Sequence, residues 1–218
     1  MIDQTPTKPR RGCLFYGCLT WTVCLLAVLV AGLLGLQQFR RMLNKYTDTQ
    51  PMPLPQVSIA PAALDQLLRR VEDFRDDLRA GRTPGQLVLS ANEVNALIQH
   101  DPELKAINGK FYVLISGDKL KAQVSLPMED LGLQRFRGRY LNGTTSLGVA
   151  LHNGILYLFA EDFVAKGKPI PAGYMDVIRR QNLAAPANEN ARASVAMNLL
   201  KSIEIKNGQL IVTPKNNQ

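Results

Sequence analysis

The amino-acid sequence predicts an α+β protein: one N-terminal transmembrane helix, then a compact domain of antiparallel β-hairpins with helices packed on one side. Three observations lead to this prediction. Residues 14–36 form a run of 23 positions without a charged side chain. Residues 62–80 repeat apolar side chains at helical spacing. From residue 110 onward, the pattern changes to the alternation of strands, interrupted by Asn-Gly turns.

The run at 14–36 is long enough to cross a bilayer core, which needs about 20 apolar residues at about 1.5 Å rise each. A cleaved signal peptide is one alternative, but its apolar region is about 7–15 residues long, and no small-x-small cleavage site follows here. A buried core helix is another. We therefore expect residues 13–46 to form a transmembrane helix with a helical extension, acting as an uncleaved signal anchor.

The charges that flank the run do not decide its orientation, because three basic residues lie on each side. They are Lys8, Arg10 and Arg11 before it, and Arg40, Arg41 and Lys45 after it. The short basic tail at 1–12 favours a cytoplasmic N-terminus. The rest of the chain is then expected in the extracytoplasmic, periplasmic space, anchored in a bacterial inner membrane.

The net charge of +8 is concentrated around the run: residues before Thr47 carry +5 and the remainder +3. This excess suits anionic lipid head groups, and it is unlike the basic patch of a nucleic-acid-binding domain. Within the run, Ala27, Ala31 and Gly35 are spaced four apart, which lets two helices approach closely. They predict a helix–helix face for self-association or a protein partner, unless they only reflect the composition of such helices.

All three cysteines, Cys13, Cys18 and Cys24, lie in or beside the run, so no disulfide is expected in the domain. Residues 47–61 contain four prolines and predict an extended linker that separates the domain from the bilayer. The domain itself is expected at 62–214.

The first elements of the domain are predicted by apolar spacing and by a cap. Residues 62–80 predict an amphipathic helix that Gly81 ends. Residues 86–89 predict a short strand. Ser90 and Glu93 then form a capping box that begins a helix running to Gln99.

Hairpins and two further helices account for the rest of the domain. Asn-Gly pairs at 153–154 and 207–208 predict tight hairpin turns, whereas Asn142-Gly143-Thr144 has the form of a glycosylation acceptor and is typical of a turn. The expected strands are 111–116, 119–126, 144–151, 155–164, 203–205 and 210–212, and the expected helices are 171–183 and 188–201.

Two clusters are candidate binding sites. Residues 155–159 are all apolar, which predicts either a central strand buried on both faces or a lipid groove lined by Ile155, Tyr157 and Phe159. Arg135, Arg137 and Arg139 are interleaved with aromatic residues. They could hold a phosphate, a phospholipid head group or an anionic glycan, or they could be solvated loop residues.

Catalytic chemistry is not indicated. The two histidines, His100 and His152, have no metal-ligand spacing with other residues, and no nucleophile or nucleotide-binding motif is present. The acidic pairs 129–130 and 161–162 are adjacent, so their side chains would point to opposite faces of a strand. We predict no catalytic, cofactor or metal site and no enzyme activity.

Three segments resemble a group of uncharacterised single-span bacterial membrane proteins: RGCLFYGC at 11–18, LSANEVNALI at 89–98 and RYLNG at 139–143. The segment 93–98 is also similar to membrane-anchored extracytoplasmic domains of unknown function. Some domains of this layout look like tubular lipid-binding folds, a fold-level analogy. The resemblance implies no cofactor, no activity and no individual site residue.

Together these observations predict a membrane-anchored extracytoplasmic binding or scaffolding protein of the bacterial cell envelope. The alternative is a domain that binds or carries a lipid or another hydrophobic ligand.

Overall fold

Helix α1 (Cys13–Tyr46) and an α+β domain follow one another in the computed structural model, which describes residues 13–215. Side chains are described from residue 21 onward, except those of residues 186 and 192. The chain divides into two units, Met1–Lys45 and Tyr46–Gln218. The basic tail predicted at 1–12 lies outside the described residues.

α1 is long and apolar enough to cross a membrane, as the sequence predicts. None of the residues in its apolar segment is buried: the leucine and valine side chains between Trp21 and Leu36 are exposed. Such exposure is typical of a helix whose surface is covered by lipid.

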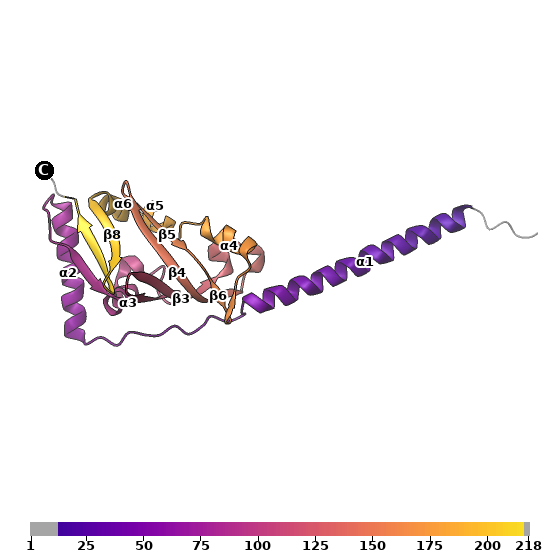
Figure 1. The fold of residues 1–218 in the computed structure, drawn as a ribbon, viewed down its shortest axis with the longest axis horizontal. Helices are drawn as coiled ribbons and strands as arrows, with labels where there is room; N and C mark the ends of the chain where they lie inside the picture. Colours follow the sequence, from indigo (N-terminus) through magenta and orange to yellow (C-terminus); the bar gives the residue numbers. More distant parts are fainter. Residues whose placement is uncertain (1–12, 216–218) are drawn as a thin grey trace, which may run out of the picture. The chain divides into compact units, whose positions relative to one another are not determined.

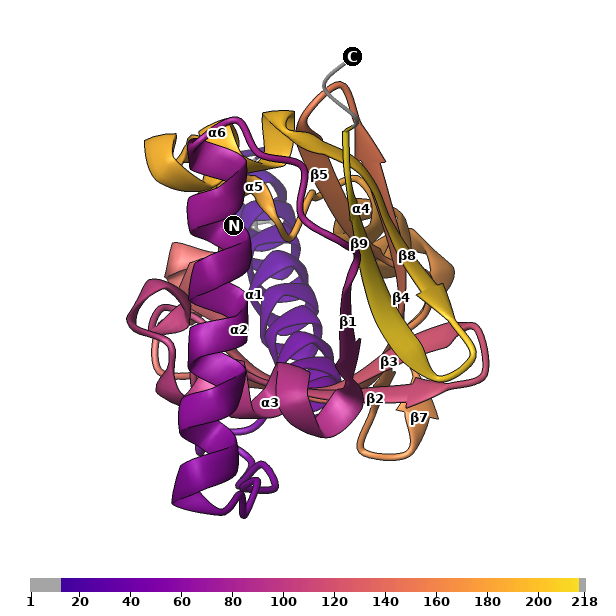
Figure 2. The same ribbon diagram turned by 90° about the vertical axis from the view of Figure 1, so that its left-hand side faces the viewer.

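The domain contains two antiparallel sheets (Figures 1 and 2). The main sheet has the strand order β2-β3-β4-β6-β7, with β5 also paired to β4, and the small sheet has the order β1-β9-β8. The strands are β1 (Leu87–Ser90), β2 (Phe111–Ser116), β3 (Lys119–Pro127), β4 (Tyr140–His152), β5 (Ile155–Ala160), β6 (Val164–Ala165), β7 (Lys168–Pro169), β8 (Leu200–Lys206) and β9 (Gln209–Pro214).

Helices complete the domain. The α-helices are α2 (Pro61–Arg79), α3 (Ala91–His100), α4 (Ala172–Arg179), α5 (Ala185–Glu189) and α6 (Ala191–Asn198), and the 3₁₀ helices are η1 (Pro102–Leu104), η2 (Met128–Leu131) and η3 (Gln134–Phe136). The prediction of an α+β fold is confirmed. The prediction of one long helix at 188–201 is wrong, because α5 ends at Glu189, α6 follows it and β8 begins at Leu200.

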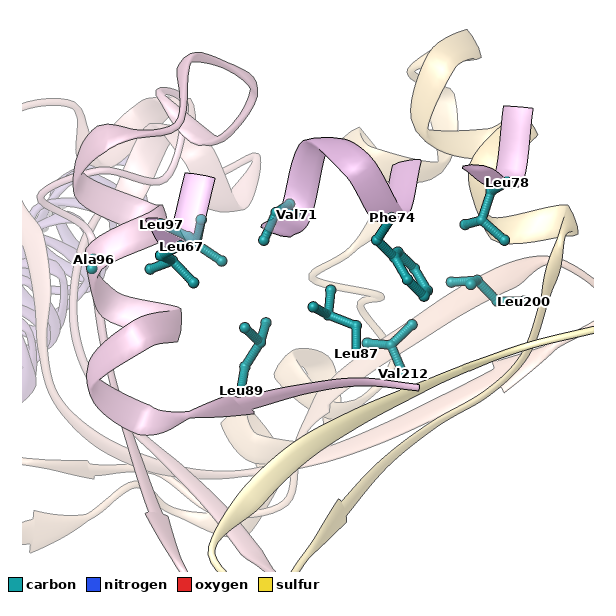
Figure 3. Close-up of a cluster of buried hydrophobic side chains, with 10 residues drawn as sticks. All are labelled: Leu67, Val71, Phe74, Leu78, Leu87, Leu89, Ala96, Leu97, Leu200 and Val212. Atoms are coloured by element: carbon teal, nitrogen blue, oxygen red, sulfur yellow. The ribbon is translucent and has the colours of Figure 1, made fainter. Parts of the chain in front are cut away.

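One core lies between α2 and the small sheet (Figure 3). Figure 2 shows α2 alongside the small sheet, with α3 at the lower end of β1. The 3–4 spacing of the sequence places one face of α2 inward, and this face is buried. The residues are Leu67, Val71, Phe74 and Leu78 from α2, Leu87 and Leu89 from β1, Ala96 and Leu97 from α3, Leu200 from β8 and Val212 from β9.

β1 and β9 come from opposite ends of the domain, and their pairing joins Leu87 to Val212 and Leu89 to Leu210. α3 begins directly after β1, at the capping box that the sequence predicts. The side chain of Ser90 accepts a hydrogen bond from the backbone of Glu93, and the Glu93 carboxylate accepts one from the backbone of Ser90 at 2.8 Å.

A second core covers one face of the main sheet. Its buried side chains come from β3, β4, β5, β6 and α4, and Tyr46 packs against them at the point where the chain enters the domain. The turns at Asn153-Gly154 and Asn207-Gly208 have positive φ at both positions, so both Asn-Gly predictions are confirmed.

β5 differs from the sequence prediction. It is an edge strand with alternating exposure and is not buried on both faces. Leu158 faces the second core, and the apolar side chains on the other face are exposed. The alternation is hidden in the sequence because both faces carry apolar residues.

Asparagine side chains pair with the outer edges of β2 and β5. Val113 of β2 donates its N–H to Asn95 Oδ1, and Asn95 Nδ2 donates to the Val113 carbonyl, both at 2.7 Å. In β5, Leu158 N–H donates to Asn182 Oδ1 and Leu156 N–H to Asn188 Oδ1, both at 3.0 Å. Each amide group therefore replaces a neighbouring strand and supplies hydrogen bonds that the edge would otherwise lack.

Replacing Asn95 with alanine should lower the free energy of unfolding by about 2–4 kcal/mol, because two backbone groups of Val113 would lose their partners in the interior. Asn95 is 2% exposed, so water cannot substitute at this place. Urea denaturation in detergent, followed by circular dichroism, measures the change.

Asn108→Ala is the matched control. Asn108 is exposed, and its amide donates one hydrogen bond to the Gln99 carbonyl. We expect a change below about 0.5 kcal/mol for this variant. Equal effects of the two substitutions would contradict the role assigned to Asn95.

Candidate functional site

The segment that follows α1 is hydrogen-bonded to the main sheet from its first residue. Thr47 is buried, and its carbonyl accepts hydrogen bonds from Arg139 at 3.3 Å and from Lys166 Nζ at 3.0 Å. Arg139 Nε also donates to Thr47 Oγ1 at 2.6 Å. Asp48 and Tyr140 exchange two backbone hydrogen bonds at 2.8 and 2.9 Å, so Asp48 is placed like a residue of an added strand.

Side chains of the sheet hold the next few residues. Asp48 forms an ion pair with Lys166 at 2.6 Å and accepts a hydrogen bond from Asn142 Nδ2 at 3.1 Å. Asn142 also donates to the Gln50 carbonyl at 2.9 Å. The backbone of Met52 donates to Asn142 Oδ1 at 3.2 Å and to Ser125 Oγ at 3.0 Å.

We call these contacts the clamp. It consists of Thr47, Asp48, Gln50 and Met52 on the incoming segment and Ser125, Arg139, Tyr140, Asn142 and Lys166 on the domain. Residues 47–52 contain no helix, bend at 49–50 and belong to the domain unit. The first residues of the linker predicted at 47–61 thus satisfy backbone groups on the domain, and Val57 further along donates to Gln99 Oε1.

Asn142-Gly143 lies inside β4 and not in a turn, which corrects the sequence interpretation. Gly143 is required by close packing: a Cβ at this position would overlap the carbonyl oxygen of Val164 and the ring of Phe163. The absence of a side chain lets β6 approach β4. Lys166 follows β6 with φ +51°, a region that favours glycine and asparagine, and its ammonium group reaches Asp48 and Thr47 from there.

A shallow, open hollow of about 740 Å³ lies beside the clamp. Its lining includes the polar side chains of Asp48, Gln123, Asn142, Thr144 and Lys166, although more of the exposed lining is apolar than polar. The Asp48 carboxylate and the Lys166 ammonium group in this lining form an ion pair with each other. The charged groups of the hollow are therefore already used in the clamp.

The predicted groove residues are together, but on an open surface. Ile155, Tyr157 and Phe159 share one face of β5 and are 44%, 40% and 38% exposed. They do not line the hollow beside the clamp. The ring of Phe159 lies over Gly148 of β4, where a Cβ would overlap it, so this side chain also covers a glycine of the neighbouring strand.

The three arginines predicted to contact an anionic group are separated by the structure. Arg139 is part of the clamp. Arg135 and Arg137 are exposed on the loop around η3. Ala27, Ala31 and Gly35 are exposed on α1, and four-residue spacing places them along one side of that helix.

The described residues contain no group of three His, Cys, Asp or Glu side chains that could hold a metal ion. Comparisons with protein-family profiles, with curated proteins and with solved structures each found no match.

The clamp predicts that Asp48 makes the free energy of unfolding depend on pH. Burial acts to raise the pKa of Asp48, but hydrogen bonds from Lys166 and Asn142 and the charges of Lys166 and Arg139 outweigh it and lower the pKa below 3.8. A carboxyl group with a lowered pKa stabilises the folded state above its unfolded pKa and loses this contribution as pH falls through the folded pKa. The stability that Asp48 contributes should therefore be complete at about pH 6 and decline in acid.

Asp48→Asn keeps the shape of the side chain and removes its charge. The difference in unfolding free energy between wild type and Asp48→Asn should be largest near neutral pH and should shrink below about pH 4. The pKa of Glu93 is also lowered, since hydrogen bonds from Ser90 and an ion pair with Arg70 outweigh its burial. Its effect is common to both proteins and cancels in the difference. A difference that does not change with pH would contradict this role of Asp48.

Proposed function

We propose that this chain is a single-pass membrane protein whose domain binds or scaffolds another component at the bacterial cell envelope. The observation that carries the proposal is the apolar surface of α1, which is uncovered along its candidate span. An exposed apolar surface of this size is unfavourable in water and is stabilised in lipid.

The clamp supports a scaffolding role. α1 ends at Tyr46, and the next residue is already bound to the domain. A domain attached through a long flexible linker would search a large volume around its anchor. This chain instead fixes the point at which the anchor joins the domain, which is useful to a protein that holds a partner at a defined place.

The N-terminus is proposed to be cytoplasmic and the domain extracytoplasmic. The lack of cysteine after Cys24 leaves the domain without thiols that an oxidising compartment could cross-link. Ala27, Ala31 and Gly35 offer a side of α1 on which a second copy could pack closely.

Two arginines near the centre of the span, Leu25→Arg with Leu29→Arg, should release the chain from membranes. Each charged residue at the centre of a helix costs about 2.5–3.5 kcal/mol on insertion. The matched control is Gln37→Arg with Gln38→Arg, which adds the same charge beyond the apolar run. After carbonate extraction we expect the wild type and the control in the pellet and the central variant in the supernatant.

Wild-type protein in the carbonate supernatant would overturn the membrane anchor. A reporter enzyme fused after Gln218 tests the orientation in the same strains. Activity of a periplasmic reporter is expected, and activity of a cytoplasmic reporter alone would reverse the proposed topology.

Replacing Ala27, Ala31 and Gly35 with leucine should weaken self-association in membranes about tenfold, because larger side chains keep the helices apart. Leu29→Phe with Leu33→Phe enlarges side chains on the opposite side of the helix and is the control. Energy transfer between labelled copies in vesicles measures both. Unchanged self-association of the triple variant would remove α1 as the contact between copies.

A further inference from the structure

We propose that one end of the domain binds the head groups of anionic lipids directly, as a second membrane contact besides α1. This inference rests on the proposed membrane anchor and adds a partner for the domain. The surface, which we call the entry surface, consists of Leu133, Arg135 and Arg137 around η3 and Tyr174 and Val177 on α4.

The entry surface lies at the end of the domain where the chain comes in from α1. Tyr46 packs against the second core, and so do Phe136 of η3 and Ile178 of α4. Arg139, two residues after Arg137, holds Thr47. Both elements of the entry surface are therefore attached to the core that receives the first residue of the domain. Figure 1 shows α4 at the same end of the domain as β6, whose turn carries Lys166 of the clamp.

The length of the chain limits how far the first residue of the domain can lie from a bilayer that α1 crosses. At most ten helical residues, about 15 Å, separate the last residue of the uncharged run, Leu36, from Tyr46. The clamp begins at Thr47, so no free linker extends this reach. A tilt of α1 shortens it further.

The apolar members of the entry surface are exposed although they are large. Leu133 is 37%, Tyr174 49% and Val177 56% exposed. Tyr174 and Val177 are three residues apart, so they share the outward side of α4, while Met175 between them is buried in the core. Aliphatic and tyrosine side chains of this kind are stabilised at the level of lipid head groups.

The arginines supply the complementary charge. Arg135 and Arg137 are exposed and form no ion pair with another described residue. On α2, by contrast, Arg70, Arg75 and Arg79 each pair with a carboxylate. The exposed acid that precedes the loop, Asp130, is paired with Lys110 at 2.8 Å. Exposed guanidinium groups that form no ion pair with a described residue are suited to binding the phosphates of an anionic bilayer, and the apolar side chains of the entry surface can contact the same bilayer.

A site-specific fluorophore on the full-length chain tests the proposal. The three native cysteines are replaced by serine, and Leu133→Cys is labelled in protein reconstituted into phosphatidylcholine vesicles with or without phosphatidylglycerol. Leu114→Cys is the matched control, because Leu114 on β2 is 39% exposed and lies outside the entry surface. Lipids with a spin label on the head group quench fluorophores that touch the bilayer surface.

In vesicles containing phosphatidylglycerol, we expect quenching about threefold stronger at position 133 than at position 114. Arg135→Gln with Arg137→Gln should reduce quenching at 133 to the control value, as should vesicles of phosphatidylcholine alone. Equal quenching at the two positions would overturn the proposal. Quenching at 133 that is independent of both arginines would overturn its anionic part.

The fluorescence of Trp21 in α1, the only tryptophan of the sequence, distinguishes a failure of the entry-surface proposal from a failure of the membrane anchor. Lipids with brominated tails quench Trp21 if α1 is inserted. Quenched Trp21 without preferential quenching at 133 leaves the anchor in place and refutes only the entry surface. Unquenched Trp21 refutes the anchor itself. If the label at position 133 is shielded from solvent in native membranes but not in lipid vesicles, a protein covers this surface. That outcome would identify a protein partner and overturn the lipid proposal.

Discussion

The edges of the main sheet are the constraint on which the arrangement of this domain depends. Backbone groups of an edge strand need partners, and an unpaired edge can bind another chain. Here asparagine amides supply these partners on two of its outer strands, from Asn95 against β2 and from Asn182 and Asn188 against β5. Asn95 lies on α3, which also packs in the core of the small sheet, so one side chain connects the two sheets.

The clamp applies the same chemistry to the entering chain. Asp48 pairs with the backbone of Tyr140, and Asn142 binds the backbone at Gln50 and Met52. Like the other three asparagines, Asn142 both donates and accepts, which is the property of an amide that a carboxylate lacks. The segment after α1 is thereby fixed in place without a helix or a long strand of its own.

Local patterns in the sequence predicted most elements but not the contacts between distant segments. The capping box at Ser90, the amphipathic helix α2 and the two Asn-Gly turns depend on neighbouring residues, and the structure confirms them. The clamp joins residues about 90 positions apart, such as Asn142 and Asp48, and no local pattern marks such a pair. Asn142-Gly143 even has the local form of a turn, because the close approach of β6 that requires Gly143 is visible only in the fold.

The pairing of β1 with β9 has a consequence for how the chain reaches this structure. The strand that completes the small sheet ends at Pro214, near the C-terminus of the chain, while the apolar face of α2 is made about 140 residues earlier. Until β9 is synthesised, α2 and β1 have an incomplete core to bury against. Folding of this part therefore has to wait until β9 has been synthesised, and the apolar face of α2 stays exposed in the meantime.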